Sequence, residues 1–223
     1  MLSLLPALQQ ADAAFPSGGF AFSNGIEGLD AMGVRLDGPA LAGVMEAVLR
    51  HRWAPCDRIA LAQAWRAGPD VARLAEIGRA LEAATLPESL RLGSRRNGAA
   101  LLAAHVRLGT PGASALQAEL EADALLGHLP LLQGALWRAV GLDEAAAIQV
   151  SGYTVASGLA SAAVRLGCLG ALPAQAALRD VLPLIAELSH GPVPDIGRLG
   201  GFLPWLDIAC ARQQGASLRL FAS

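Results

Sequence analysis

The chain has 223 residues, of which 53% are hydrophobic and 16% are charged, and its formal net charge is −2. A near-neutral charge gives no electrostatic basis for binding nucleic acid or an anionic membrane surface. So apolar a composition predicts either a large core or surface that is buried against other chains. The 3 cysteines include no CxxC pair, which argues against a disulfide scaffold and favours a reducing, cytoplasmic location.

Apolar residues recur every three or four positions along most of the chain, which predicts helices. The first two cover residues 3–11 and 25–32, and a third opens at Asp37. Further helices are predicted from Pro55 to Gly68, from Asp70 onward, from a Thr85–Glu88 capping box to Leu108, and over residues 114–127, 130–140, 143–166, 174–189 and 204–213. No run alternates with a period of two residues. The expected fold is therefore all-α, a single-domain bundle of about ten helices over residues 1–223.

Two stretches bear on how the bundle is organised. Residues 190–201 are dense in proline and glycine, which predicts a linker that lets the last helix and the tail, residues 214–223, lie apart from the bundle. Residues 145–164 carry no charge and are about long enough to cross a membrane. Small residues recur in this stretch at four-residue steps, so we predict a central buried helix instead. The first residues lack a basic region, and no signal peptide is expected.

No group of residues predicts an active site. The histidines His51, His105, His128 and His190 are scattered, and the cysteines are isolated, so metal-ligand spacing is absent. No phosphate-binding glycine motif is found, and Ser17 lacks the frame of a nucleophile elbow. His105 lies on an apolar helix and is expected to be a core or rim histidine with its hydrogen bonds satisfied. We expect no enzyme activity, no cofactor and no bound metal.

Three stretches are candidates for contact with other proteins. Residues 14–27 (AFPSGGFAFSNGIE) gather three phenylalanines around a glycine turn, either as core or as an interaction edge. Arg91 and Arg95 lie four residues apart on one helix, either as a solvated face or as a site for an acidic partner. The tail ends in SLRLFAS, which packs back on the bundle or binds a partner. The candidate partner-binding residues are Ser17, Gly18, Gly19, Phe20, Phe22, Glu27, Arg91, Arg95, Arg219, Leu220 and Phe221.

Several of these segments resemble the urease accessory protein UreF family. Residues 14–27 resemble that family's A-F-P-T/S-G-G-F-A-H-S-x-G-L-E signature. Four more matches follow in order and span nearly the whole chain. They are Ser94, Gly98, Leu101 and Leu102 (S-x3-G-x2-LL), residues 127–134 (H-L-P-x-x-x-G), residues 161–170 (S-A-A-V-R-L-x-P-L-G) and residues 219–221 (R-L-F).

The resemblance implies a non-enzymatic, all-α scaffold of urease maturation. Such a protein would form a homodimer, bind the accessory protein UreD (UreH in some systems) and recruit the GTPase UreG. This assembly would deliver nickel to apo-urease. The chain departs from the family pattern at Phe22, Cys168, Ala171, Gln213, Gln214 and Ser217, which puts any role of those positions in doubt. A helical small-ligand binder, with residues 145–164 walling an apolar pocket, is the alternative.

Overall fold

The computed structural model describes residues 4–17 and 25–214, with the backbone alone at 211–214. This described part is all helical and contains no strand, which confirms the predicted fold class. Its α-helices are α1 (Leu4–Ala11), α2 (Ile26–Ala31), α3 (Gly38–Val48), α4 (Arg58–Ala67), α5 (Val71–Ala84), α6 (Glu88–Arg107), α7 (Ala113–Glu121), α8 (Leu129–Ala139), α9 (Glu144–Arg165), α10 (Ala171–Ser189) and α11 (Pro204–Gln214). A π-helix, η2 (Leu49–Asp57), joins α3 to α4, and a 3₁₀ turn, η3 (Ile196–Arg198), lies between α10 and α11.

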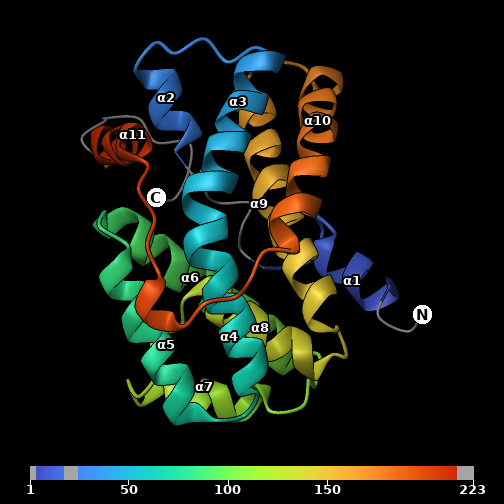
Figure 1. The fold of residues 1–223 in the computed structure, drawn as a ribbon, viewed down its shortest axis with the longest axis vertical. Helices are drawn as coiled ribbons and strands as arrows, with labels where there is room; N and C mark the ends of the chain where they lie inside the picture. Colours follow the sequence, from blue (N-terminus) through green and yellow to red (C-terminus); the bar gives the residue numbers. More distant parts are fainter. Residues whose placement is uncertain (1–3, 18–24, 215–223) are drawn as a thin grey trace.

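The helices form two packed groups (Figure 1). In one group α10 packs against both α3 and α9, and in the other α8 packs against α4 and α6. The continuous path α3–η2–α4 runs through both groups. Trp53 of η2 is fully buried among residues of the first group, and its indole Nε1 donates a hydrogen bond to Ser151 Oγ of α9 at 3.1 Å.

The small residues of α9 act as predicted. A Cβ at Gly152 would lie 2.9 Å from the Trp53 ring and 2.8 Å from Ile185 of α10, so the glycine allows both side chains to approach the helix. Within the described residues, no helix has the length and the apolar character that a bilayer crossing demands.

Two other helix crossings depend on glycine. A Cβ at Gly134 of α8 would overlap the carbonyl oxygen of Leu61 in α4. A Cβ at Gly98 of α6 would overlap the carbonyl oxygen of Gly127, just before α8. In both places a helix rests directly on the backbone of its neighbour, and a backbone carbonyl has little freedom to move aside. These glycines therefore set the separation of α4, α6 and α8.

Hydrogen bonds hold α1 to the bundle. Gln10 is its only buried residue, and Gln10 Oε1 accepts from Trp137 Nε1 of α8 at 2.8 Å. The same oxygen lies 3.2 Å from Nε2 of His105, whose Nδ1 lies 2.8 Å from Thr110 Oγ1. His105 is fully buried, as predicted, and burial lowers the pKa of its imidazole, so the ring is neutral at pH 7.

Several helix boundaries follow the predicted capping residues. The carboxylates of Asp37 and Asp70 accept from the N–H groups of Ala40 and Arg73, each three residues further on. The capping box predicted at Thr85 is wrong. Thr85 Oγ1 instead donates to the carbonyl of Leu81 at 2.8 Å, and α6 begins after Pro87 without a side-chain cap.

The predicted restart at Pro55 is also wrong, because the helix continues through this residue as η2. Pro55 has no N–H to donate to the carbonyl of His51, one α-helical turn earlier. Phe202 N–H supplies the missing hydrogen bond to His51 O at 3.1 Å, and Gly200 N–H donates to Pro55 O at 3.2 Å. We call residues 199–203 the strap. The expected separation of the last helix is therefore wrong: the strap is bonded to η2, and α11 packs on α2 and α6.

Candidate functional site

The structure describes four of the predicted partner-binding residues. Ser17 is half-buried at the end of the first described segment, Glu27 is buried in α2, and Arg91 and Arg95 are half-buried on α6. Gly18, Gly19, Phe20, Phe22, Arg219, Leu220 and Phe221 lie outside the described residues.

Arg91 is engaged within the protein. Its Nε lies 3.2 Å from Glu82 Oε1 of α5, and its NH1 donates to the carbonyls of Thr85 and Leu86 at 2.8 and 2.7 Å. The guanidinium thus fixes the turn between α5 and α6. Among the described residues, Arg95 makes a longer approach of 3.8 Å to the same Glu82 oxygen, so fewer of its donors are engaged than those of Arg91.

Glu82 also binds a histidine that the sequence did not single out. Its Oε2 lies 2.8 Å from Nε2 of His128, which is buried just before α8. Ser94 Oγ accepts from Leu129 N–H, so its own hydrogen is free to point at His128 Nδ1, 3.3 Å away. Burial lowers the pKa of His128 although Glu82 opposes the shift, and the neutral ring donates from Nε2. The cluster ties α5, α6 and α8 together beneath the two arginines.

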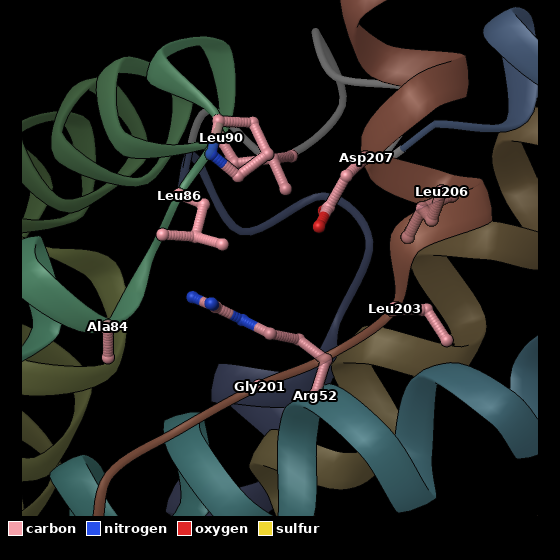
Figure 2. A pocket seen from close by; sticks show the side chains of 9 residues that line it. Arg52, Ala84, Leu86, Leu90, Gly201, Leu203, Leu206 and Asp207 are labelled. Carbon is pink, nitrogen blue, oxygen red and sulfur yellow. The ribbon is translucent and has the colours of Figure 1, made fainter.

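A small cavity lies beside the turn that Arg91 holds. Its volume is about 20 Å³, and residues of η2, α5, α6, the strap and α11 line it. Figure 2 shows the Arg52 side chain reaching into it from η2, with Asp207 pointing toward it from α11. At the surface around it, Leu86 is 69% exposed and Phe202, next to the lining residue Gly201, is 74% exposed. We call the surface formed by Leu86, Arg91, Arg95 and Phe202 the α6–α11 face.

Close backbone contact fixes α11 at one edge of this face. A Cβ at Gly28 of α2 would overlap the carbonyl oxygen of Ala209, and one at Gly25 would overlap Leu206. Gly25 also has a φ of +90°, a conformation that favours glycine. Both glycines thus allow α11 to lie directly on α2, the helix that carries Glu27. The structure therefore brings α2, α6 and α11 into one region of the molecule.

A second surface is formed by α1. Leu4, Leu5 and Leu8 are 61%, 74% and 58% exposed, although they share one side of a short helix. An eight-residue helix gains little stability by itself, and exposing three leucines lowers it further. We call these three residues the α1 leucine face. Neighbouring exposed apolar side chains of this kind are typical of a surface that another protein covers.

A groove of about 550 Å³ lies between α1 and the C-terminal half of α6. Its lining includes Phe15 and three alanines of α6, with Asp12 and Arg107 as the charged groups. Neither this groove nor the small cavity is lined by α9. If the chain were a small-ligand binder, α9 would be expected to form the wall of its pocket.

Two of the three cysteines, Cys56 and Cys210, are buried in the apolar cores. Burial raises the pKa of both Cys56 and Cys210 to about 12, so their thiols stay protonated at pH 7. Cys168 is half-buried, with its Sγ 3.7 Å from Asp30 Oδ1. Across the part of the chain that the structure describes, no three His, Cys, Asp or Glu side chains gather as a metal site.

Known proteins of one family match this sequence. The family model UreF matches residues 37–182. The urease accessory protein UreF of Trichodesmium erythraeum is 30% identical over 226 residues, which cover 98% of this chain and 96% of that protein. UreF of Cereibacter sphaeroides is 31% identical over 221 residues, covering 98% of both chains, and UreF of Yersinia enterocolitica is 27% identical over 232 residues, covering 99% and 98%. The chain therefore belongs to the UreF family of urease accessory proteins.

Proposed function

We propose that this chain is a non-enzymatic scaffold for urease maturation in the cytoplasm. It binds a UreD/UreH-like accessory protein, and the pair recruits a UreG-like GTPase that delivers nickel to apo-urease. The chain is a single domain that holds its partners in a fixed arrangement, while the GTPase and urease supply the nucleotide and metal chemistry. Membership of the UreF family supports this role, and the α6–α11 face is the structural observation that carries it.

The α6–α11 face suits a contact with another protein. It combines exposed apolar side chains, Leu86 and Phe202, with the partly free guanidinium of Arg95. Aromatic and arginine side chains are the commonest anchors of protein interfaces. The tail follows α11 in the sequence, and we propose that Arg219, Leu220 and Phe221 bind the same partner.

The α1 leucine face suits a second copy of the chain. A two-fold axis would bring the same three leucines of both protomers together, because a symmetric dimer uses one patch twice. The ridge carries no charge that would oppose this pairing. We therefore assign the homodimer contact to α1 and leave the α6–α11 face to the accessory partner.

Deleting residues 219–223 tests the partner contact. We expect the affinity for the UreD/UreH-like partner to fall by at least about 30-fold, because a buried arginine or aromatic anchor contributes roughly 2 kcal/mol or more. Affinity is measured by titrating the partner with the purified chain, and circular dichroism checks that helix content is unchanged. The matched control deletes only Ala222 and Ser223 and keeps full affinity. Equal affinity of both truncated chains for the partner would refute the role of the tail.

A further inference from the structure

Pro55 opens the helical path α3–η2–α4 to a distant segment of the chain. Proline has no N–H to donate to the preceding turn of the helix, so a carbonyl of that turn is left for another donor. The carbonyl of His51 accepts from Phe202 N–H of the strap at 3.1 Å. The carbonyl of Pro55 itself accepts from Gly200 N–H at 3.2 Å. Two backbone hydrogen bonds therefore join the strap to η2 at its proline.

Hydrogen bonds also fix the chain before the strap. No residue from 191 to 202 is buried, and Figure 1 shows this segment crossing the path α3–η2–α4 between α10 and α11. Arg58, which is itself buried at the start of α4, donates to the carbonyls of Gly191 and Pro192 at 2.8 Å each. The course of the segment thus depends on polar contacts with η2 and α4, and the two bonds at Pro55 set its last part.

The strap lies directly on η2, yet it presents a large aromatic side chain outward. A Cβ at Gly201 would lie 2.9 Å from Arg52 Cδ and 3.4 Å from the carbonyl oxygen of His51. Phe202, the next residue, is bonded to η2 through its backbone, while its side chain is 74% exposed. An anchor on a fixed backbone loses little conformational freedom when it binds. Phe202 is therefore arranged as a preorganised contact of the α6–α11 face.

The proline is kept in an unfavourable place. Proline is the residue least favoured inside a helix, and the chain accommodates Pro55 within the wider turns of η2. Helical turns of the π type are rare and occur frequently at functional sites. The contact that this irregularity makes possible is the one with the strap.

We propose that Pro55 is a positioning residue, which docks the strap on η2 and so holds the Phe202 side chain in place for the accessory partner. The inference rests on the proposed role of the α6–α11 face in partner binding. Alanine at position 55 would restore an N–H that competes for the carbonyl of His51. The backbone of Phe202 would then lose its acceptor, and its side chain would have more freedom to lose on binding.

A double-mutant cycle of Pro55→Ala and Phe202→Ala tests this proposal. The affinity for the UreD/UreH-like partner is measured for the full chain, for each single variant and for the double variant. We expect Phe202→Ala to weaken binding about 30-fold, as the loss of an aromatic anchor does, and Pro55→Ala to weaken it about 10-fold. In the Phe202→Ala background, Pro55→Ala should have no effect. Pro183→Ala, which removes an exposed proline inside α10, is the matched control and should keep full affinity.

Hydrogen exchange separates positioning from a loss of stability. In the Pro55→Ala chain the amide of Phe202 should exchange faster than in the parent, and the new N–H at position 55 should be protected. The amides of α9 should exchange as they do in the parent. The melting temperature should not fall, because alanine is favoured over proline inside a helix.

Gly201→Ala tests the same contact from the side of the strap. Its new methyl group would meet Arg52 and push the strap away from η2, so binding should weaken in the parent and stay unchanged in the Phe202→Ala background. Gly197→Ala is the control, because Gly197 lies before the strap and a Cβ there has no neighbour within 4 Å. It should leave the affinity as it is.

The possible results are distinguishable. If Phe202→Ala weakens binding and Pro55→Ala does not, the positioning role is wrong and the role of the α6–α11 face stands. An equal effect of Pro55→Ala in both backgrounds, or unchanged exchange of the Phe202 amide, would also overturn the positioning role. If Phe202→Ala itself is silent, the positioning role falls with it. The scaffold function is then decided separately by nickel loading of urease, which does not depend on Pro55.

Discussion

Replacing Gly134 with alanine is expected to lower the free energy of unfolding by about 3 kcal/mol, since overpacking a core costs roughly 1–3 kcal/mol even where side chains can yield. Here the new methyl group meets backbone: it would overlap Leu61 O and lie 2.9 Å from Trp65 N. The helices α4 and α8 would have to separate, and the cores on both sides would lose contact. For a chain of this length the melting temperature should fall by about 6–12 °C.

Gly43→Ala is the matched control for this change. Gly43 lies within α3 and is exposed, and a Cβ there has no neighbour within 4 Å. Alanine favours a helix over glycine by up to about 1 kcal/mol, so this variant should be as stable as the parent or slightly more stable. Thermal unfolding, monitored by circular dichroism, gives the melting temperature of both variants. If the Gly134→Ala chain has the same melting temperature as the Gly43→Ala chain, α4 and α8 are not in backbone contact.

Replacing Leu5 and Leu8 together with aspartate is expected to convert the proposed homodimer into monomers. Burying one leucine contributes about 1.5–3 kcal/mol, and a two-fold interface loses four leucines and gains four facing carboxylates. The dissociation constant should therefore rise about a thousand-fold or more. Both side chains are exposed in the single chain. In monomeric protein the substitutions should therefore change the helix content and the melting temperature little.

Sedimentation velocity over a range of concentrations measures this dissociation. Leu172→Asp on α10 is the control, because Leu172 is 84% exposed and lies outside the α1 leucine face. It should leave the dimer intact. If the Leu5→Asp/Leu8→Asp chain sediments as a dimer, or if Leu172→Asp dissociates it, the assignment of the dimer contact to α1 is wrong.

Local features of the fold could be predicted from the sequence. Asp37 and Asp70 cap helices where their spacing predicted, since a capping bond spans only three residues. The buried position of His105 follows from the apolar helix around it. The glycines of two family-like segments, Gly98 and Gly134, also have a clear structural reason, because each allows a helix crossing.

Features that depend on distant parts of the chain could not be predicted. Pro55 indicates a helix end when only its neighbours are considered, yet the strap about 150 residues later supplies the hydrogen bond that the proline removes. Arg52 and Asp207, which line one cavity, are separated by a similar length of chain, and no pattern in the sequence relates them. The sequence does not predict the exposure of the α1 leucines, because leucines on one side of a helix normally indicate a buried face. The inward side of α1 is the one that carries the buried Gln10 and the core-packed Ala7.

Nickel loading of urease tests the central claim most directly. The urease structural proteins are produced together with the UreD/UreH-like and UreG-like proteins, with and without this chain, and the purified urease is assayed for bound nickel and activity. We predict that both appear only when the chain is present, and that the chain itself hydrolyses no urea. Urease that acquires its full nickel content and activity without the chain would contradict the account.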